Sequence, residues 1–274
     1  MKPVNFDYAR PKDVDASLSL LAEDGRSVKV VAGSQSLGPM LNMRLVQPDL
    51  LVDITGVEEL RQVSEEADGV VIGACVTHSD IEDRRVPDVT GGALPSVARG
   101  IAYRAVRNRG TIGGSLTHAD PSADWISILA ALGASVTPRG PHGVRTIPVE
   151  DYMLGALEAD LRPGELLVSV KTPRLGRSAR WGYHKICRKT GEFAQAIGAF
   201  VVDPERDLCR AVIGATETRP IIIADARRII ADSAPEHFDS QATDELVSAA
   251  GMNDPLERQT HVVALRRAVQ RAAS

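Results

Sequence analysis

Aromatic residues, cysteines and long apolar runs are all scarce in this chain of 274 residues. Phe, Trp and Tyr make up only 4% of the sequence, which argues against the stacking platforms that bind single-stranded nucleic acid. Apolar runs, such as 166–168 and 221–224, are far shorter than the roughly 20 residues of a membrane-spanning helix. The formal net charge of −4 also does not favour a nucleic-acid-binding surface. We therefore expect no nucleic-acid partner and no membrane insertion.

The three cysteines, Cys75, Cys187 and Cys209, lie far apart and form no Cys-x-x-Cys pair. The sequence therefore lacks a zinc or iron–sulfur signature, and we expect no metal site. An odd number of cysteines, together with an N-terminus that has no apolar stretch, favours reduced thiols in a cytoplasmic protein. With 43% hydrophobic and 25% charged residues, the composition is that of a globular protein with one large domain or two small ones.

Short β-branched runs alternate with helical patterns along the first part of the chain, which predicts an α+β fold with α/β-like parts. An Asp cap predicts a helix at 13–21, and Thr77 resembles the start of another. One helix is expected over 94–106, and a long loop over 111–124 is expected to lead into a helix at 125–132. Strands are expected at 28–31, 50–54, 70–74, 134–137 and 166–171.

A polar stretch with Pro and Gly at 172–178 indicates a domain boundary. Beyond it, strand-like runs at 196–202 and 208–215 flank a turn at 203–207, which predicts a hairpin. Helical patterns follow at 224–231, 239–249 and 255–272.

Two loops of small residues are the most informative features among the 23 glycines. Residues 32–36, Ala-Gly-Ser-Gln-Ser, directly follow a predicted strand, and residues 111–115, Thr-Ile-Gly-Gly-Ser, place two glycines between hydroxyl residues. Small side chains let a diphosphate approach closely, and backbone N–H groups can bind it without Lys or Arg. Neither loop matches the P-loop or the Rossmann fingerprint. On these residues alone, each loop could equally be an ordinary tight turn.

These loops, together with the stretches 37–45, 72–78, 109–110, 118–121, 163–167 and 183–194, give the chain a resemblance to a known family. It resembles the FAD-binding medium subunits of molybdenum hydroxylases, which include the carbon monoxide dehydrogenase medium subunit and the flavin domain of xanthine dehydrogenase. The resemblance implies a two-lobed FAD-binding domain of the PCMH type over residues 1–175, with lobes at about 1–55 and 56–175. It also implies a C-terminal domain of the carbon monoxide dehydrogenase flavoprotein type over 176–274, a sheet with helices.

The resemblance also implies which residues bind FAD. The first loop would wrap the diphosphate, and the second would close on the flavin from the other side. Asp124 matches an acidic residue that holds ribose or ribityl hydroxyls, Leu167 a leucine against the ring system, and Lys185 a lysine that reaches the flavin region. No catalytic residue is implied. The implied cofactor-binding residues are Lys29, Val31, Ala32, Gly33, Ser34, Gln35, Ser36, Leu37, Thr111, Ile112, Gly113, Gly114, Ser115, Asp124, Leu167 and Lys185.

Two positions depart from the family pattern. Ser34 stands where a glycine is usual, and Ser115 where Asn or Asp is common. If position 34 needs a positive φ, serine costs about 1 kcal/mol there. The shorter Ser115 side chain would make its flavin contact through water.

By resemblance, the chain is the FAD-carrying electron-transfer subunit of an oxidoreductase complex. The molybdenum cofactor would lie on a large partner subunit and [2Fe–2S] clusters on a small one, in a heterotrimer that is itself doubled. Electrons would pass from those clusters to FAD and then to an external acceptor. The alternatives are a free-standing flavin oxidoreductase and a structural subunit without FAD. The sequence indicates neither the substrate nor the acceptor.

Overall fold

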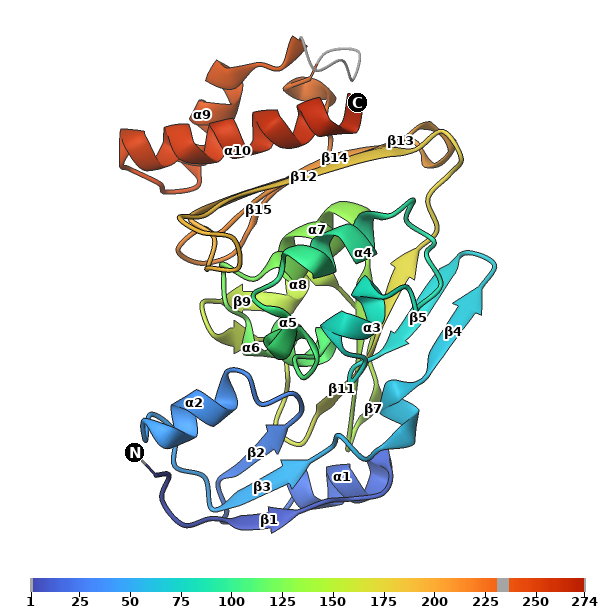
Figure 1. Ribbon diagram of the computed structural model, residues 1–274, viewed down its shortest axis with the longest axis vertical. Coiled ribbons are helices and arrows are strands. Elements are labelled where there is room, and N and C mark those ends of the chain that lie inside the picture. The colour runs from blue at the N-terminus through green and yellow to red at the C-terminus, as the bar shows by residue number, and fades with distance from the viewer. Residues whose placement is uncertain (1, 231–236, 274) are drawn as a thin grey trace.

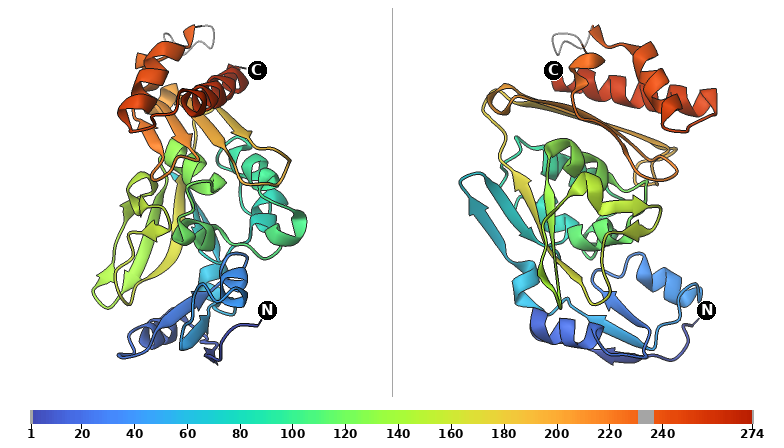
Figure 2. Two further views of the ribbon diagram at one scale, coloured as in Figure 1. Left: turned by 90° about the vertical axis from the view of Figure 1, so that its left-hand side faces the viewer. Right: turned by 180° about the vertical axis from the view of Figure 1, so that it is seen from behind.

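The computed structural model describes residues 2–230 and 237–273. Three parts follow one another along the long axis of the molecule (Figure 1). A small lobe contains the N-terminus, a middle part contains the largest sheet, and a C-terminal sheet carries two helices on its outer face (Figure 2). Each part has a hydrophobic cluster of its own. The mixture of helices and sheets confirms the predicted α+β class.

The small lobe is built on three parallel strands in the order β1 (Asp7–Ala9), β3 (Leu50–Asp53) and β2 (Val28–Val31). Parallel neighbours need crossover connections, which contain α1 (Val14–Leu21) and α2 (Leu37–Asn42). The cap predicted for α1 is confirmed, because the Asp13 side chain accepts a hydrogen bond from the Ala16 N–H.

The middle part is an antiparallel sheet with helices to one side of it in Figure 1. α7 is buried along its whole length, because it lies between this sheet and the C-terminal one. A hairpin of two short strands follows the last helix. The strands of the sheet are β4 (Val63–Glu66), β5 (Gly69–Gly73), β6 (Ser135–Gly140), β7 (Gly143–Val144), β8 (Ile147–Pro148) and β11 (Leu166–Pro173). The hairpin is β9 (Met153–Gly155) and β10 (Glu158–Ala159), and the helices are η1 (Glu58–Arg61), α3 (His78–Glu82), α4 (Ala93–Gly100), α5 (Arg104–Arg107), α6 (Ile112–His118), α7 (Asp124–Leu132) and α8 (Val149–Tyr152).

Two predictions for the middle part are wrong. The helix expected over 94–106 is broken after Gly100, and Ala102 adopts a φ of 41° before α5 begins. The long loop expected over 111–124 contains α6, which begins after Thr111 because the threonine hydroxyl accepts the Gly114 N–H. Tertiary packing overrides the low helix propensity of its glycines. A Cβ on Gly113 would lie 2.5 Å from that of Ala74, so only glycine lets α6 approach β5 so closely.

The C-terminal part is an antiparallel meander of β12 (Arg180–Ile186), β13 (Ala196–Asp203), β14 (Leu208–Gly214) and β15 (Ile221–Ile223). The predicted hairpin is confirmed, with its turn in η2 (Pro204–Arg206). The helix predicted over 224–231 is only a single turn, η3 (Ala226–Arg228), and residue 231 lies outside the described residues. α9 (Ser240–Ala249) and α10 (Pro255–Ala273) confirm the last two predicted helices.

Close packing of α10 on this sheet depends on glycine. A Cβ on Gly182 of β12 would lie 1.8 Å from the Ala268 carbonyl oxygen, and one on Gly198 of β13 would lie 2.5 Å from that of Ala264. With α10 on its outer face, the sheet turns its inner face toward α7. Alternate residues of β12 therefore point toward the middle part of the molecule.

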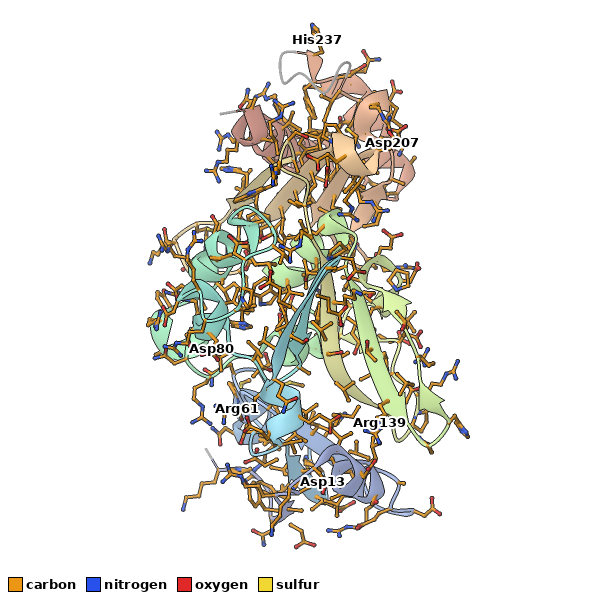
Figure 3. All side chains as sticks on the ribbon, turned by 90° about the vertical axis from the view of Figure 1, so that its right-hand side faces the viewer. Asp13, Arg61, Asp80, Arg139, Asp207 and His237 are labelled. Atoms are coloured by element: carbon orange, nitrogen blue, oxygen red, sulfur yellow. The ribbon has the colours of Figure 1, made fainter. Side chains whose placement is uncertain are left out.

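The small lobe and the middle part also meet at the surface. Arg139 of β6 lies close to α1 (Figure 3), and its guanidinium is 2.6 Å from an Asp15 carboxylate oxygen. Such an exposed pair adds at most about 1 kcal/mol to stability. Among the described residues, none of the helices is long and apolar enough to span a membrane.

Candidate functional site

Gly33 brings the two predicted loops together. A Cβ on this residue would lie 2.1 Å from the Arg109 carbonyl oxygen and 2.7 Å from the Gly110 Cα. No side chain fits in that space, so the turn between β2 and α2 packs directly on the backbone before α6. The start of α6 is close as well, because a Cβ on Gly114 would lie 3.8 Å from that of Ala32.

The first loop has backbone donors without acceptors. Within the part of the chain that the structure describes, the N–H groups of Gly33, Ser34, Gln35 and Ser36 donate no hydrogen bond. Ser34 adopts a left-handed conformation with φ 61°, and its carbonyl oxygen accepts the Gly38 N–H at 3.0 Å. Successive N–H groups around a residue of this conformation form concavities that bind anions. The loop is therefore suited to a phosphate-bearing ligand.

The second loop differs from the first in that its backbone N–H groups have hydrogen-bond acceptors within the protein. Its N–H groups are hydrogen-bonded within the protein: Ile112 to the Val76 carbonyl, Gly113 to that of Ala74, and Gly114 and Ser115 to Thr111. The expectation of free N–H groups in both loops is therefore wrong for residues 112–115, because they form the first turn of α6. This loop supplies a closely packed wall beside the first one.

Asp124 and Lys185 lie together although they come from different parts of the fold. Lys185 Nζ is 2.9 Å from Asp124 Oδ1 and 3.0 Å from Oδ2, and it also donates to the Gly100 carbonyl at 2.9 Å. Tyr183 donates its hydroxyl hydrogen to Asp124 Oδ1 at 2.6 Å. The side chains of Lys185 and Asp124 are only 11% and 8% exposed.

Burial governs the titration of this cluster. It raises the pKa of Asp124, while the charge of Lys185 and the hydrogen bonds from Tyr183 and Lys185 act in the opposite direction. Burial and the neighbouring Asp124 carboxylate also raise the pKa of Tyr183 far above its ordinary value. The tyrosine therefore remains a hydrogen-bond donor at neutral pH.

The remaining predicted residues are not gathered in one cluster. Lys29 is exposed on β2, whereas Val31 and Leu37 are partly buried beside the first loop. Leu167 lies on β11 and is only 3% exposed, within the core of the middle part. The chain's own side chains therefore cover Leu167, and it offers a ligand little surface.

His78 packs against Gly110, the residue directly before the second loop. Its Nδ1 accepts the indole N–H of Trp125 at 3.0 Å, and a Cβ on Gly110 would lie 2.8 Å from its Nε2. Burial and the nearby Arg107 lower the pKa of His78 to about 4. The residue is therefore a neutral packing residue at neutral pH.

A cavity of about 840 Å³ lies between the loop before α4, residues 174–177, the start of β12 and the end of α10, and Tyr183 of the Asp124 cluster is among the residues that line it. None of the predicted cofactor-binding residues lines it. Among the described residues, no three His, Cys, Asp or Glu side chains gather as a metal site would require.

The sequence and the fold agree with one known family. The family described as FAD binding domain in molybdopterin dehydrogenase matches residues 4–175. The chain belongs to this family. It is 37% identical over 202 residues to the carbon monoxide dehydrogenase medium chain of Hydrogenophaga pseudoflava, covering 74% of this chain and 70% of the relative. It is 36% identical over 247 residues to the 6-hydroxypseudooxynicotine dehydrogenase complex subunit alpha of Paenarthrobacter nicotinovorans, covering 88% and 83%.

Solved structures of this family share the whole fold. A carbon monoxide dehydrogenase structure from Hydrogenophaga pseudoflava matches with a TM-score of 0.89 and 30% identity, covering 100% of this chain and 99% of the other. Quinoline 2-oxidoreductase from Pseudomonas putida 86 matches with a TM-score of 0.86 and 32% identity, covering 100% and 98%. The similarity therefore includes the C-terminal part, beyond the residues that the family match covers.

As a member of this FAD-binding family, the chain is an FAD-dependent oxidoreductase subunit. The first loop fits the cofactor, because its four N–H groups lack acceptors within the described chain and the diphosphate of FAD is an anion that needs donors. The space around Gly33 excludes any side chain, so the loop packs directly on the backbone of Arg109 and Gly110.

The serine at position 34 adopts a strained conformation. Its φ of 61° is one that glycine adopts without cost. We therefore expect Ser34→Gly to raise the free energy of unfolding by about 1 kcal/mol while FAD remains bound. Urea denaturation of both proteins measures this difference. The expectation fails if the variant is less stable by a similar amount, which would mean that the Ser34 hydroxyl makes a compensating bond.

Tyr183 is the site residue that sequence reasoning missed. It lies two residues before Lys185 on β12, and residues at this spacing share one face of a strand. Recognising β12 from the sequence would have placed Tyr183 and Lys185 on the same face. The run Arg-Trp-Gly-Tyr-His-Lys-Ile does not alternate clearly between apolar and polar residues, so this signal was weak.

Proposed function

We propose that the chain is the electron-transfer flavoprotein subunit of a molybdenum hydroxylase complex. In this role it accepts electrons from [2Fe–2S] clusters of a partner subunit and passes them to an external acceptor. The observation that carries the proposal is the first loop, whose N–H groups at residues 33–36 donate no hydrogen bond within the described chain and which packs at Gly33 on the backbone before α6. The family membership and the match of the whole chain to carbon monoxide dehydrogenase structures support it.

Each part of the site has a distinct task in this proposal. The N–H groups of residues 33–36 bind the diphosphate, and the start of α6 forms the opposite wall. Asp124 accepts hydrogen bonds from cofactor hydroxyls, and the charge of Lys185 opposes the rise in the pKa of that carboxyl that burial causes. FAD itself supplies reversible one- and two-electron chemistry when bound. The protein contributes binding, orientation and a fixed electrostatic environment.

The other redox centres of the complex are proposed to lie on partners. Two [2Fe–2S] clusters would need eight thiolates at four for each cluster, and the chain has three cysteines. We infer a small iron–sulfur subunit and a large molybdenum subunit, arranged as a dimer of heterotrimers in the cytoplasm. The relatives' names specify different substrates at similar identities, so these similarities do not indicate the substrate of this complex, and we propose none.

The complex purified with its own partner subunits tests this proposal. We expect flavin absorption bands, release of FAD identified by mass, and reduction of the flavin after the iron–sulfur signals when substrate is added in a stopped-flow experiment. A chain that oxidises NADH without partners would instead favour a free-standing oxidoreductase. A colourless protein that also fails to take up added FAD would favour a structural subunit.

A further inference from the structure

Alternate residues of β12 attach the C-terminal sheet to the middle part of the molecule. The Trp181 indole donates to the Gly91 carbonyl at 3.0 Å, and the Tyr183 hydroxyl donates to Asp124 at 2.6 Å. Lys185 donates to Asp124 and to the Gly100 carbonyl. These three anchors follow the two-residue period of a strand, so they share one face of β12.

The anchors differ in what they contact. Trp181 binds a neutral backbone carbonyl in the loop before α4. Tyr183 and Lys185 both bind the Asp124 carboxylate, whose side chain is 8% exposed. A buried carboxylate needs hydrogen-bond donors because it has lost most of its water. Trp181 therefore attaches the two parts, whereas Tyr183 and Lys185 also act on a charged group of the site.

Tyr183 and Lys185 constrain the carboxylate in different ways. Lys185 Nζ is 2.9 Å from Oδ1 and 3.0 Å from Oδ2, so it lies almost equally close to both oxygens. The last torsion of an Asp side chain is broad, and an ammonium placed between the oxygens does little to fix it. Tyr183 donates to Oδ1 alone. It therefore distinguishes the two oxygens and holds the plane of the carboxylate in one orientation.

We propose that Tyr183 is a positioning residue of the FAD site, and that it acts by orienting the Asp124 carboxylate. This inference rests on the proposed function, which places Asp124 at the cofactor. With Oδ1 engaged by Tyr183, Oδ2 retains accepting capacity for a ligand hydroxyl. β12 is then part of the cofactor site as well as the strand that attaches the C-terminal sheet.

The test compares Tyr183→Phe with Trp181→Phe in the full complex. The first removes a single oxygen atom and with it the bond to Asp124. The second removes the indole bond to Gly91 and serves as the matched control, because it weakens the attachment without touching Asp124. FAD affinity, the visible circular dichroism of the bound flavin and the melting temperature are measured for each. The circular dichroism band reports the surroundings of the flavin, which a merely structural role would leave unchanged.

We expect Tyr183→Phe to weaken FAD binding about tenfold, as for the loss of one hydrogen bond to a charged group, and to change the flavin circular dichroism. Trp181→Phe should change FAD affinity less than about twofold. Equal weakening by both variants would show that attachment alone matters, and unchanged affinity and dichroism in Tyr183→Phe would also overturn the inference.

Two further arms keep the test decisive. If Tyr183→Phe does not fold, 3-fluorotyrosine at position 183 keeps the shape and strengthens the phenol as a donor. An altered flavin dichroism at an unchanged melting temperature would then support the inference, and an unaltered band would overturn it. If the wild-type complex takes up no FAD, the proposed function itself fails. That outcome is distinct from an altered or an unaltered flavin dichroism in the variants, because it is seen in the wild type.

Discussion

Replacing Gly33 with alanine weakens FAD binding by at least about two orders of magnitude. The added Cβ would lie 2.1 Å from the Arg109 carbonyl oxygen and 2.7 Å from the Gly110 Cα. Both obstacles are backbone atoms, so the turn at 32–36 and the segment before α6 must move apart. Overpacking of this kind costs about 3 kcal/mol or more, which corresponds to a loss of affinity of about 100-fold or greater. Titration of the deflavinated complex with FAD, followed by flavin fluorescence, measures the loss.

Gly100→Ala is the control for this experiment. A Cβ on Gly100 meets no atom within 4 Å, and alanine suits the helical end of α4. The substitution also keeps the backbone carbonyl of residue 100, which is the only group of this residue that contacts Lys185 in the described structure. This variant should bind FAD as the wild type does. An affinity of Gly33→Ala within threefold of the wild type would falsify the view that the contact between the loops shapes the cofactor site.

Replacing Lys185 with methionine lowers the free energy of unfolding by about 3 to 5 kcal/mol at pH values where Asp124 is ionised in the folded protein, because it leaves the buried Asp124 carboxylate without its charged partner. The pKa of Asp124 is already raised by burial, and the charge of Lys185 and its hydrogen bond oppose that rise. Without Lys185 the pKa of the folded carboxyl rises further above its unfolded value. Urea denaturation at several pH values measures both the loss and its pH dependence.

The direction of the pH dependence follows from linkage. A carboxyl whose pKa is higher in the folded state binds its proton more tightly there than in the unfolded chain. The destabilisation of Lys185→Met is therefore greatest above the folded pKa of Asp124, and it shrinks as the pH falls through that value.

Adding Asp124→Asn to this variant removes the buried charge and should recover most of the stability that Lys185→Met loses in that higher pH range. A double variant no more stable than Lys185→Met would contradict this account.

Local patterns in the sequence predicted helices and turns correctly where the structure is determined by residues that are neighbours in the chain. The cap at Asp13 fixes the start of α1, and the Pro-containing turn at 203–207 joins β13 to β14 as predicted. The prediction of α6 failed because Gly113 and Gly114 are poor helix formers. Gly113 is required by a contact with Ala74, which is far away in sequence, and a local pattern carries no trace of such a contact.

In the candidate site, too, the local features were predictable from the sequence and the contacts between distant residues were not. The composition of the loop 32–36 predicted its suitability for a phosphate, and the structure places unpaired N–H groups there. The proximity of Asp124 to Lys185 was beyond local reasoning, because the two residues are 61 positions apart in the chain. Family resemblance assigned both to the cofactor without indicating that they contact each other. Tyr183, the third member of the cluster, was found only in the structure.

The 61-residue separation of Asp124 and Lys185 sets an order of events during synthesis. At about 5–20 residues per second, the ribosome adds Lys185 roughly 3 to 12 seconds after Asp124. Throughout that interval the nascent chain already contains the loop at 32–36 and the start of α6, but it has no partner for the carboxylate. Pairing of Asp124 with Tyr183 and Lys185 must therefore wait for β12 to emerge, so completion of this buried cluster is a late step in the maturation of the subunit.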